Sequence, residues 1–200
     1  MQLVKIINYF NPENPLELEI LKGEKVLLKG PSGIGKTLSI ETILNISIHK
    51  QSKIQVLSDR ISKFDKTGYS AQSSWSLGGN LVNEVSLFGG EHINKKRLKN
   101  ACYASCISDC LDYKKIINHE WNKKSTENLS AGELKRLSIA RVLYTNPKFL
   151  ILDEPTSSVQ QQLKNLIIKR ILTTYHDSTI LIISHDTYSN INFDRVILWK

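Results

Sequence analysis

The sequence of 200 residues has no long hydrophobic run. Its longest apolar stretches, such as residues 26–28 and 180–183, are far shorter than the roughly 20 residues that cross a bilayer as a helix. No N-terminal segment combines a charged start, an apolar middle and a small-residue cleavage site, so no secretory signal is predicted. We therefore expect a cytosolic domain, one that can still dock on a membrane protein.

Cysteine is also scarce. The three cysteines, Cys102, Cys106 and Cys110, follow one another at a spacing of four, which puts them on one face of a helix. An odd number so close together argues against a disulfide framework and indicates a reducing compartment. A metal site is one interpretation, but no CxxC pair or neighbouring histidine accompanies them, and free cysteine often packs as a small hydrophobe. We favour packing.

Basic residues outnumber acidic residues, so the net charge is +8. A basic balance can indicate nucleic acid or an acidic membrane surface as a partner. The lysines are nevertheless scattered, and the short clusters at residues 95–97 and 114–115 fall on predicted helices. A solvated surface is the favoured interpretation, and the pattern argues against nucleic acid.

The first third of the chain predicts strands around a glycine-rich loop. Two strands joined by a turn rich in proline and asparagine indicate an antiparallel β piece. A short apolar run then ends directly at Gly30, and a helix with apolar residues at near-helical spacing follows Thr37. One more strand is expected before the sequence becomes polar and helix-like. The predicted strands cover residues 3–10, 16–20, 25–29 and 53–57.

The rest of the chain predicts a helical part and then alternating strands and helices. Residues 75–128 are polar and helix-like, which is typical of an inserted helical subdomain. Residues 149–152 form a continuous apolar run, as in a strand buried on both faces. Strands at 179–184 and 195–199 alternate with helices at 133–144 and 162–175. Such alternation indicates an α/β core with a largely parallel sheet.

The clearest motif matches GxxxxGK[ST], the phosphate-binding loop. Glycines let backbone N–H groups approach phosphates closely, and the following helix directs its positive end at them. The lysine is expected to reach the β- and γ-phosphates, and the threonine hydroxyl to bind Mg²⁺. The motif residues are Gly30, Pro31, Ser32, Gly33, Ile34, Gly35, Lys36 and Thr37.

Two adjacent carboxylates, Asp153 and Glu154, follow the apolar run at residues 149–152. Ligands of open α/β sheets bind where the strands end, so the pair is expected to face the phosphate loop. Asp153 can hold Mg²⁺ through water, and Glu154 can accept a proton from the attacking water. The sequence therefore predicts hydrolysis as well as binding.

A third motif, LSAGE, covers residues 129–133 and leads into a helix. Ser130 with Glu133 three residues later is a capping-box arrangement. A helix start that carries a hydroxyl and a glycine is also suited to a second phosphate contact. The two interpretations are compatible.

The order of these motifs, with Gln72 and His185, resembles the nucleotide-binding domain of ABC transporters. The resemblance covers essentially the whole chain. It implies a P-loop NTPase (RecA-like) core with a mixed, mostly parallel sheet, an N-terminal antiparallel β subdomain and an inserted helical subdomain. The expected division is a single domain, residues 1–200, with core segments 1–72 and 130–200 and a helical subdomain at 73–129.

The resemblance further implies roles for individual residues and a paired assembly. Gln72 would connect Mg²⁺ and the attacking water to a transmembrane partner, and His185 would contact the γ-phosphate. Ser130 and Gly132 would contact ATP held by a second ABC domain in a head-to-tail homodimer or heterodimer. An aromatic residue, Phe10 rather than Tyr9, would stack on adenine. The expected location is the cytoplasmic side of a membrane.

The chain departs from the family pattern at two motif positions. Ala131 replaces a glycine of the signature, a change that is commonly tolerated. Gln160 replaces an aspartate that contacts the neighbouring subunit, which affects the expected coupling between subunits rather than ATP binding. The segment at residues 76–84 resembles the region by which exporter-type domains meet their membrane helices.

Other nucleotide-binding classes fit less well. Asp65 to Gly68 fits a GTPase DxxG pattern, but the NKxD-like element at Asn122 lacks its carboxylate. A small-molecule kinase would not explain LSAGE or His185. A non-transporter ABC ATPase that serves nucleic acid or ribosomes, and a nucleotide-gated regulator with weak hydrolysis, stay as alternatives.

Overall fold

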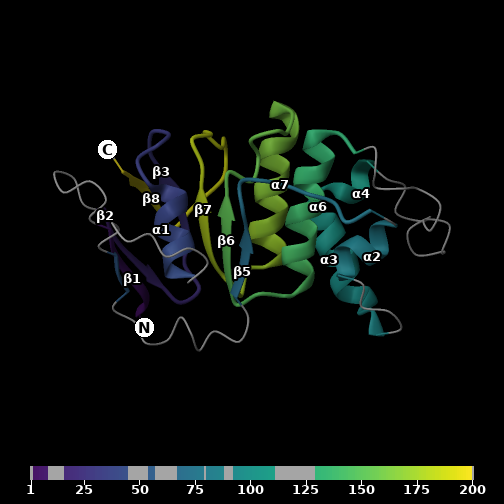
Figure 1. Ribbon diagram of the computed structural model, residues 1–200, viewed down its shortest axis with the longest axis horizontal. Coiled ribbons are helices and arrows are strands. Elements are labelled where there is room, and N and C mark those ends of the chain that lie inside the picture. The colour runs from purple at the N-terminus through teal and green to yellow at the C-terminus, as the bar shows by residue number, and fades with distance from the viewer. Residues whose placement is uncertain are drawn as a thin grey trace.

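The computed structural model describes residues 2–8, 16–44, 54–56, 67–78, 80–87, 92–110 and 129–199. These residues form two sheets and a group of helices (Figure 1). An antiparallel sheet lies at one end of the molecule, a parallel sheet lies in the middle, and the shorter helices gather at the other end.

The central sheet has five strands in the order β5-β6-β7-β3-β8. Every pairing between these strands is parallel. This result confirms the predicted α/β class with a parallel sheet. The strands are β5 (Thr67–Ser70), β6 (Phe149–Asp153), β7 (Thr179–Ile183), β3 (Lys25–Lys29) and β8 (Arg195–Leu198).

Both faces of this sheet are buried, because apolar side chains alternate between two core clusters. Leu150 and Leu152 of β6 belong to one cluster, whereas Phe149 and Ile151 of the same strand belong to the other. Every residue of β6 and of β7 is buried. The continuous apolar runs that predicted these strands are therefore explained by burial on two sides.

The antiparallel sheet contains β1 (Gln2–Asn8), β2 (Leu16–Leu21) and β4 (Ile54–Val56), in the order β2-β1-β4. The predicted antiparallel β piece is confirmed by the pairing of β1 with β2. The strand predicted at residues 53–57 also forms, and it joins β1 in this sheet rather than the central one.

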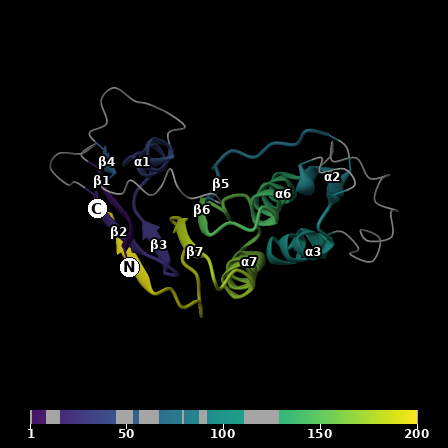
Figure 2. The ribbon, with the colours of Figure 1, turned by 90° about the horizontal axis from the view of Figure 1, so that it is seen from below.

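Helices cover the central sheet on its two sides (Figure 2). Helix α1 (Lys36–Ile43) lies near β3, and the longer helices α6 (Ala131–Tyr144) and α7 (Gln161–Thr174) lie together on the other side. The helices α2 (Leu81–Ser86), α3 (Lys95–Ala104) and α4 (Ile107–Cys110) adjoin α6. They fall inside the segment 73–129 that the sequence predicts to be helical, whose exact limits stay a prediction.

Two of the three cysteines have described side chains, and both are core residues. Cys102 and Cys106 are fully buried, and burial raises the pKa of the Cys102 thiol to about 12. A thiol with so high a pKa is a packing group rather than a nucleophile. Among the described helices, none is long and apolar enough to cross a membrane.

Strand β5 is a finding that the sequence did not predict. Its four residues, Thr67–Ser70, contain no apolar run, and Gly68 within them normally weakens a strand. The reason for Gly68 is close packing. A β-carbon at this position would lie 2.7 Å from Cγ1 of Val142 and 3.0 Å from Cβ of Pro147. Helix α6 and the turn after it therefore lie against the bare backbone of β5.

Substituting Gly68 by alanine should destabilise the fold by about 1–3 kcal/mol, the usual cost of overpacking a tight contact. Urea denaturation would measure the loss. Shortening the opposing side chain in a Gly68→Ala/Val142→Ala double variant should recover part of it, because one of the two clashes is removed. Simple addition of the two single losses would contradict the proposed contact.

Candidate nucleotide-binding site

The phosphate loop occupies the position that the sequence predicts, between the end of β3 and the start of α1. Gly33 and Gly35 have φ angles of +81° and +102°, a region that side chains with a β-carbon rarely adopt. Lys36 is 9% exposed, and its ammonium donates hydrogen bonds to the carbonyls of Gly30 (2.8 Å) and Pro31 (2.7 Å). The loop is thus wound around the lysine that is predicted to contact phosphates.

Strand β6 brings a carboxylate to this loop. The Thr37 hydroxyl donates a hydrogen bond of 2.5 Å to Oδ2 of Asp153. Burial raises the pKa of Asp153, and the neighbouring Glu154 raises it further, while the Thr37 hydrogen bond and the charges of Lys135 and Lys36 oppose the rise. The structure therefore joins two residues that the sequence analysis assigned to one metal site.

The donors in this pair fit Mg²⁺. A hydroxyl and a carboxylate are hard oxygen ligands of the kind that this ion prefers. Asp153 is 1% exposed, so its charge is poorly solvated and would be compensated by a cation. The metal roles of Thr37, Asp153 and Gln72 stay predictions.

Glu154 and His185 meet at the neighbouring strand ends. Nδ1 of His185 lies 2.9 Å from Oε2 of Glu154, and the His185 backbone N–H donates to Oε1 at 3.2 Å. The Ser184 hydroxyl donates to Oε2 at 3.3 Å. Glu154 has a φ of +46°, an uncommon conformation for a residue with a side chain. Backbone strain of this kind is often retained where a side chain must be aimed.

A hydrogen-bonded network extends from this pair to α7, and sequence reasoning missed it. The Thr156 hydroxyl donates to Oδ2 of Asp186 at 2.6 Å, and Lys164 donates to Oδ1 at 2.6 Å. Burial raises the pKa of Asp186, but these two hydrogen bonds, together with the charges of Lys164 and His185, leave the pKa below its usual value. Tyr188 lies 2.9 Å from the Thr156 hydroxyl and donates to Ser184 at 3.1 Å. The loop after Glu154 is therefore fastened to the loop that carries His185.

The LSAGE segment forms the start of α6, and its capping box is present. Ser130 accepts from the backbone N–H of Glu133, and Glu133 accepts from the Ser130 backbone N–H at 2.9 Å. Ser130 is exposed, and Gly132 packs near the backbone of Ser158. Their predicted phosphate contact involves a second chain, so a single chain does not test it.

Gln72 is exposed and lies two residues beyond β5. Its side chain is free of the core, but its backbone carbonyl accepts a hydrogen bond from Lys135 at 3.1 Å. The predicted adenine contacts, Phe10 and Tyr9, lie outside the described residues. Lys135 itself was not predicted, because nothing in one sequence distinguishes a buried lysine in a helix from a surface lysine.

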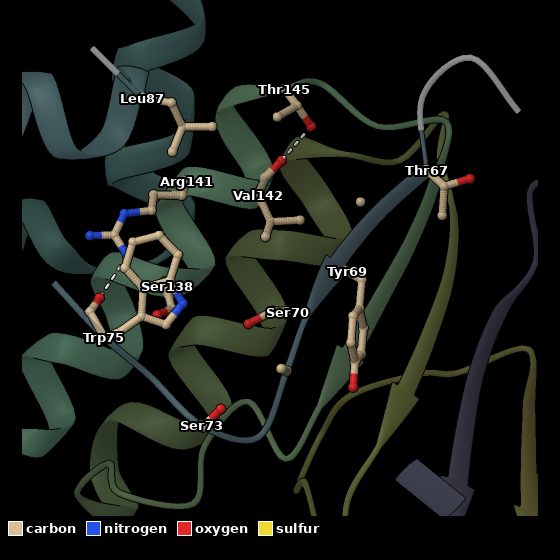
Figure 3. A pocket seen from close by; sticks show the side chains of 12 residues that line it. Thr67, Tyr69, Ser70, Ser73, Trp75, Leu87, Ser138, Arg141, Val142 and Thr145 are labelled. Carbon is tan, nitrogen blue, oxygen red and sulfur yellow. Dashed lines mark hydrogen bonds between the residues drawn. The ribbon is translucent and has the colours of Figure 1, made fainter. Parts of the chain in front are cut away.

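The segment that follows β5 and contains Gln72 is called the Gln72 loop (residues 71–78). A pocket of about 310 Å³ lies beside it (Figure 3). It is bounded by the backbone of β5, by α6 and by the end of α2, and Arg141 stacks on the Trp75 ring at its rim with 4.3 Å between guanidinium and ring centre. Trp75 and Leu87, which line it, are 52% and 49% exposed, and Leu77, two residues after Trp75 in the chain, is 56% exposed. These exposed apolar side chains make the face a candidate contact surface.

The comparisons with known proteins assign the family. The ABC transporter family model matches residues 14–157, so the chain belongs to the ABC transporter family. It corresponds to the nucleotide-binding part of these transporters.

The relatives are transport proteins. The chain is 28% identical to the ATP-dependent permease MDL1 of Candida albicans, over 98% of this chain and 31% of that protein. It is 26% identical to the alpha-hemolysin translocation ATP-binding protein HlyB of Escherichia coli O6:H1, over 96% of this chain and 28% of that protein. A putative ABC transporter ATP-binding protein of Sulfurisphaera tokodaii is 27% identical, with 98% and 44% covered. The chain thus spans less than half the length of these relatives.

A solved structure has the same fold. A bacterial Atm1-family ABC exporter with ATP bound superposes with a TM-score of 0.75 and 18% identity, over 98% of this chain and 37% of that one. At this identity the likeness establishes the fold.

Helix α7 has an unusual N-cap. Gln160 is the N-cap residue of this helix, and its side chain makes no capping hydrogen bond. Glutamine is poorly suited to this position, where aspartate and asparagine are preferred. The departure from the family pattern therefore has a local cost within the described structure.

Gln160→Asp should stabilise the chain by about 0.5–2 kcal/mol, since a capping oxygen and a favourable charge are added at a helix start. Thermal and urea unfolding would measure the gain. Gln160→Asn supplies the capping oxygen without the charge and should give most of this gain in stability, whereas Gln160→Ala should give none. Equal stability of all four proteins would show that the cap is irrelevant.

Proposed function

We propose that the chain binds ATP with Mg²⁺ and hydrolyses it to power transport across a membrane, as the nucleotide-binding component of an exporter-type ABC transporter. The observation that carries this proposal is the meeting of Thr37 with Asp153 beside the Glu154–His185 pair, at the edge of the sheet where the phosphate loop begins. Binding groups and a candidate base thus occupy one site.

Each residue of the site has a proposed role. Backbone N–H groups of the loop Gly30–Thr37 and the ammonium of Lys36 bind the phosphates. Thr37, Asp153 and Gln72 hold Mg²⁺, which when bound offsets phosphate charge and orients the reacting oxygens. Phe10 stacks on adenine.

Glu154 is the proposed general base. Its carboxylate accepts hydrogen bonds from the backbone N–H of His185 and from Ser184, which fix its direction. A carboxylate held in this way can accept the proton of an attacking water. His185, whose side chain is 62% exposed, can turn one ring nitrogen to Glu154 and present the other to the γ-phosphate.

The proposed partners are a second ABC domain and a transmembrane domain. Ser130 is exposed at the start of α6, where a helix N-terminus favours an anion. The apolar face formed by Trp75, Leu77 and Leu87 is suited to a helix from a membrane domain, because its side chains would be buried by such a contact. We place the chain on the cytoplasmic side of that membrane.

Glu154→Gln should lower steady-state ATP hydrolysis at least about 100-fold, the contribution expected of a general base, and leave ATP affinity within a few-fold. Phosphate release and binding of a fluorescent ATP analogue would be measured on the same preparations. Glu19→Gln, which changes an exposed carboxylate on β2, is the matched control and should behave as wild type.

Lys36→Ala distinguishes binding from catalysis in the same assays. It should weaken ATP binding roughly 10- to 100-fold, since charge-assisted hydrogen bonds are lost. Lys29→Ala, one residue before the loop, removes an equal charge and should bind normally. Unchanged hydrolysis in Glu154→Gln, or wild-type affinity in Lys36→Ala, would refute the assigned role.

The paired arrangement predicts that ATP joins two chains. The parent is Glu154→Gln/Glu133→Gln, in which the second change removes the carboxylate that contacts the Ser130 side chain and would repel an acidic replacement there. In this parent, MgATP should produce a dimer in light scattering after gel filtration, because binding continues without turnover. Adding Ser130→Asp should abolish the dimer, since a carboxylate would face the γ-phosphate, while helix capping is retained. Asn94→Asp makes a comparable change at the N-cap of α3 and should leave the dimer intact. A dimer that survives Ser130→Asp would exclude this contact.

A further inference from the structure

Lys135 is a buried cation at the centre of the site. It lies one turn inside α6 and is 2% exposed. Its ammonium donates to three backbone carbonyls, those of Ala71 (2.8 Å), Gln72 (3.1 Å) and Asp153 (3.1 Å). An ammonium has three protons, so each one has a partner.

The three carbonyls belong to separate parts of the site. Ala71 and Gln72 follow β5, and Asp153 is the last residue of β6. The lysine itself belongs to the helix that begins after Ser130. One side chain therefore joins the LSAGE helix, the Gln72 loop and the carboxylate strand.

A second cation of α6 holds the other end of the same loop. Arg141 donates from Nη1 to the carbonyl of Trp75 at 2.7 Å and from Nε to the carbonyl of Glu84 at 3.0 Å. It also pairs with the Glu84 carboxylate, which is fully buried. The described residues between β5 and α2 form no regular structure. Side chains of α6 hold this loop by hydrogen bonds to its backbone carbonyls.

A lysine in this place is costly. Burial lowers the pKa of Lys135 to about 8, although Asp153 and Glu154 oppose the change. An apolar side chain would avoid the desolvation but leave three carbonyls without these bonds. The arrangement is best explained by a need to fix those carbonyls.

We propose that Lys135 is a positioning residue for hydrolysis, which holds the Gln72 backbone against the end of β6 so that the Gln72 side chain points at the metal site. The inference rests on the proposed function, in which Gln72 connects Mg²⁺ and water. The three ammonium protons of Lys135 are donated to backbone carbonyls, so its proposed effect on turnover is exerted through Gln72.

Lys25 offers a matched control, because it also donates to three backbone carbonyls. Its ammonium bonds to Gly23 (2.5 Å), His176 (2.8 Å) and Ser178 (2.8 Å), at the amino end of β3 and away from the phosphate loop. Lys25→Met and Lys135→Met remove the same chemical group. Both are expected to lower the unfolding temperature.

Only Lys135→Met should lower turnover. We expect kcat to fall about 10-fold or more with the KM for ATP within about three-fold, and Lys25→Met to keep wild-type kcat. Lys135→Gln retains two donors and should recover part of the loss, and it replaces Lys135→Met if that variant does not fold. Equal kcat values for the Lys25 and Lys135 variants would overturn the proposal.

A double-mutant cycle with Gln72→Ala shows whether Lys135 acts through Gln72. In the Gln72→Ala background, Lys135→Met should have little further effect on kcat, because the side chain that it positions is already absent. Equal fold losses in both backgrounds would overturn the inference. A wild-type kcat in Gln72→Ala would also overturn the inference, because Lys135 could then not act through Gln72. Failure of the proposed ATPase function would instead be seen in the Glu154→Gln and Lys36→Ala assays.

Trp75 supplies a readout that does not depend on turnover. It lies three residues after Gln72 and is half exposed. In a Trp121→Phe/Trp199→Phe chain, MgATP should change its fluorescence. The change should persist with Lys25→Met and disappear with Lys135→Met although ATP still binds. A persistent change in Lys135→Met would contradict the proposed link between the helix and this loop.

Discussion

The parallel alignment of the central strands is the constraint on which the rest of the molecule depends. Leu28 of β3 lies beside Ile183 of β7, and Ile183 lies beside Asp153 of β6. Strands that point in one direction end at one edge, so the loops that leave them emerge together. The phosphate loop, the Asp153–Glu154 pair and His185 meet for this reason. The alignment in turn requires apolar residues on both faces of the sheet, which the two core clusters provide.

Helix α6 performs several tasks along its length. Its first residues carry the exposed capping box, and its middle and end carry the buried cations Lys135 and Arg141. Carbonyl groups bond to both cations, and the buried Glu84 carboxylate also pairs with Arg141, because unpaired charges would be too costly inside a core. The helix therefore connects the surface proposed to meet a second ATP with the loop proposed to meet a membrane domain. Direct hydrogen bonds from Lys135 and Arg141 join α6 to the backbone carbonyls of Gln72 and Trp75.

Much of the fold was predictable from local patterns, and part of the site was not. The runs at β6 and β7 predicted their strands because burial on two faces demands continuous apolar residues. Strand β5 was missed because its stability comes from an edge position and from the contact of Gly68 with α6, which no local pattern encodes. Lys135 and the Lys164–Asp186 pair were missed for a related reason. Their partners are distant in sequence, and several of them are backbone carbonyls that carry no residue-specific signal.

The sequence by itself determined the chemical groups and the family. Spacing within Gly30–Thr37, the adjacent carboxylates and the LSAGE cap are local features, and their order along the chain is sufficient to assign the class. Only the tertiary structure decided which groups touch: Thr37 with Asp153, His185 with Glu154, and Lys135 with the Gln72 loop. These contacts follow from strand order and helix packing, which depend on the core as a whole rather than on any short segment.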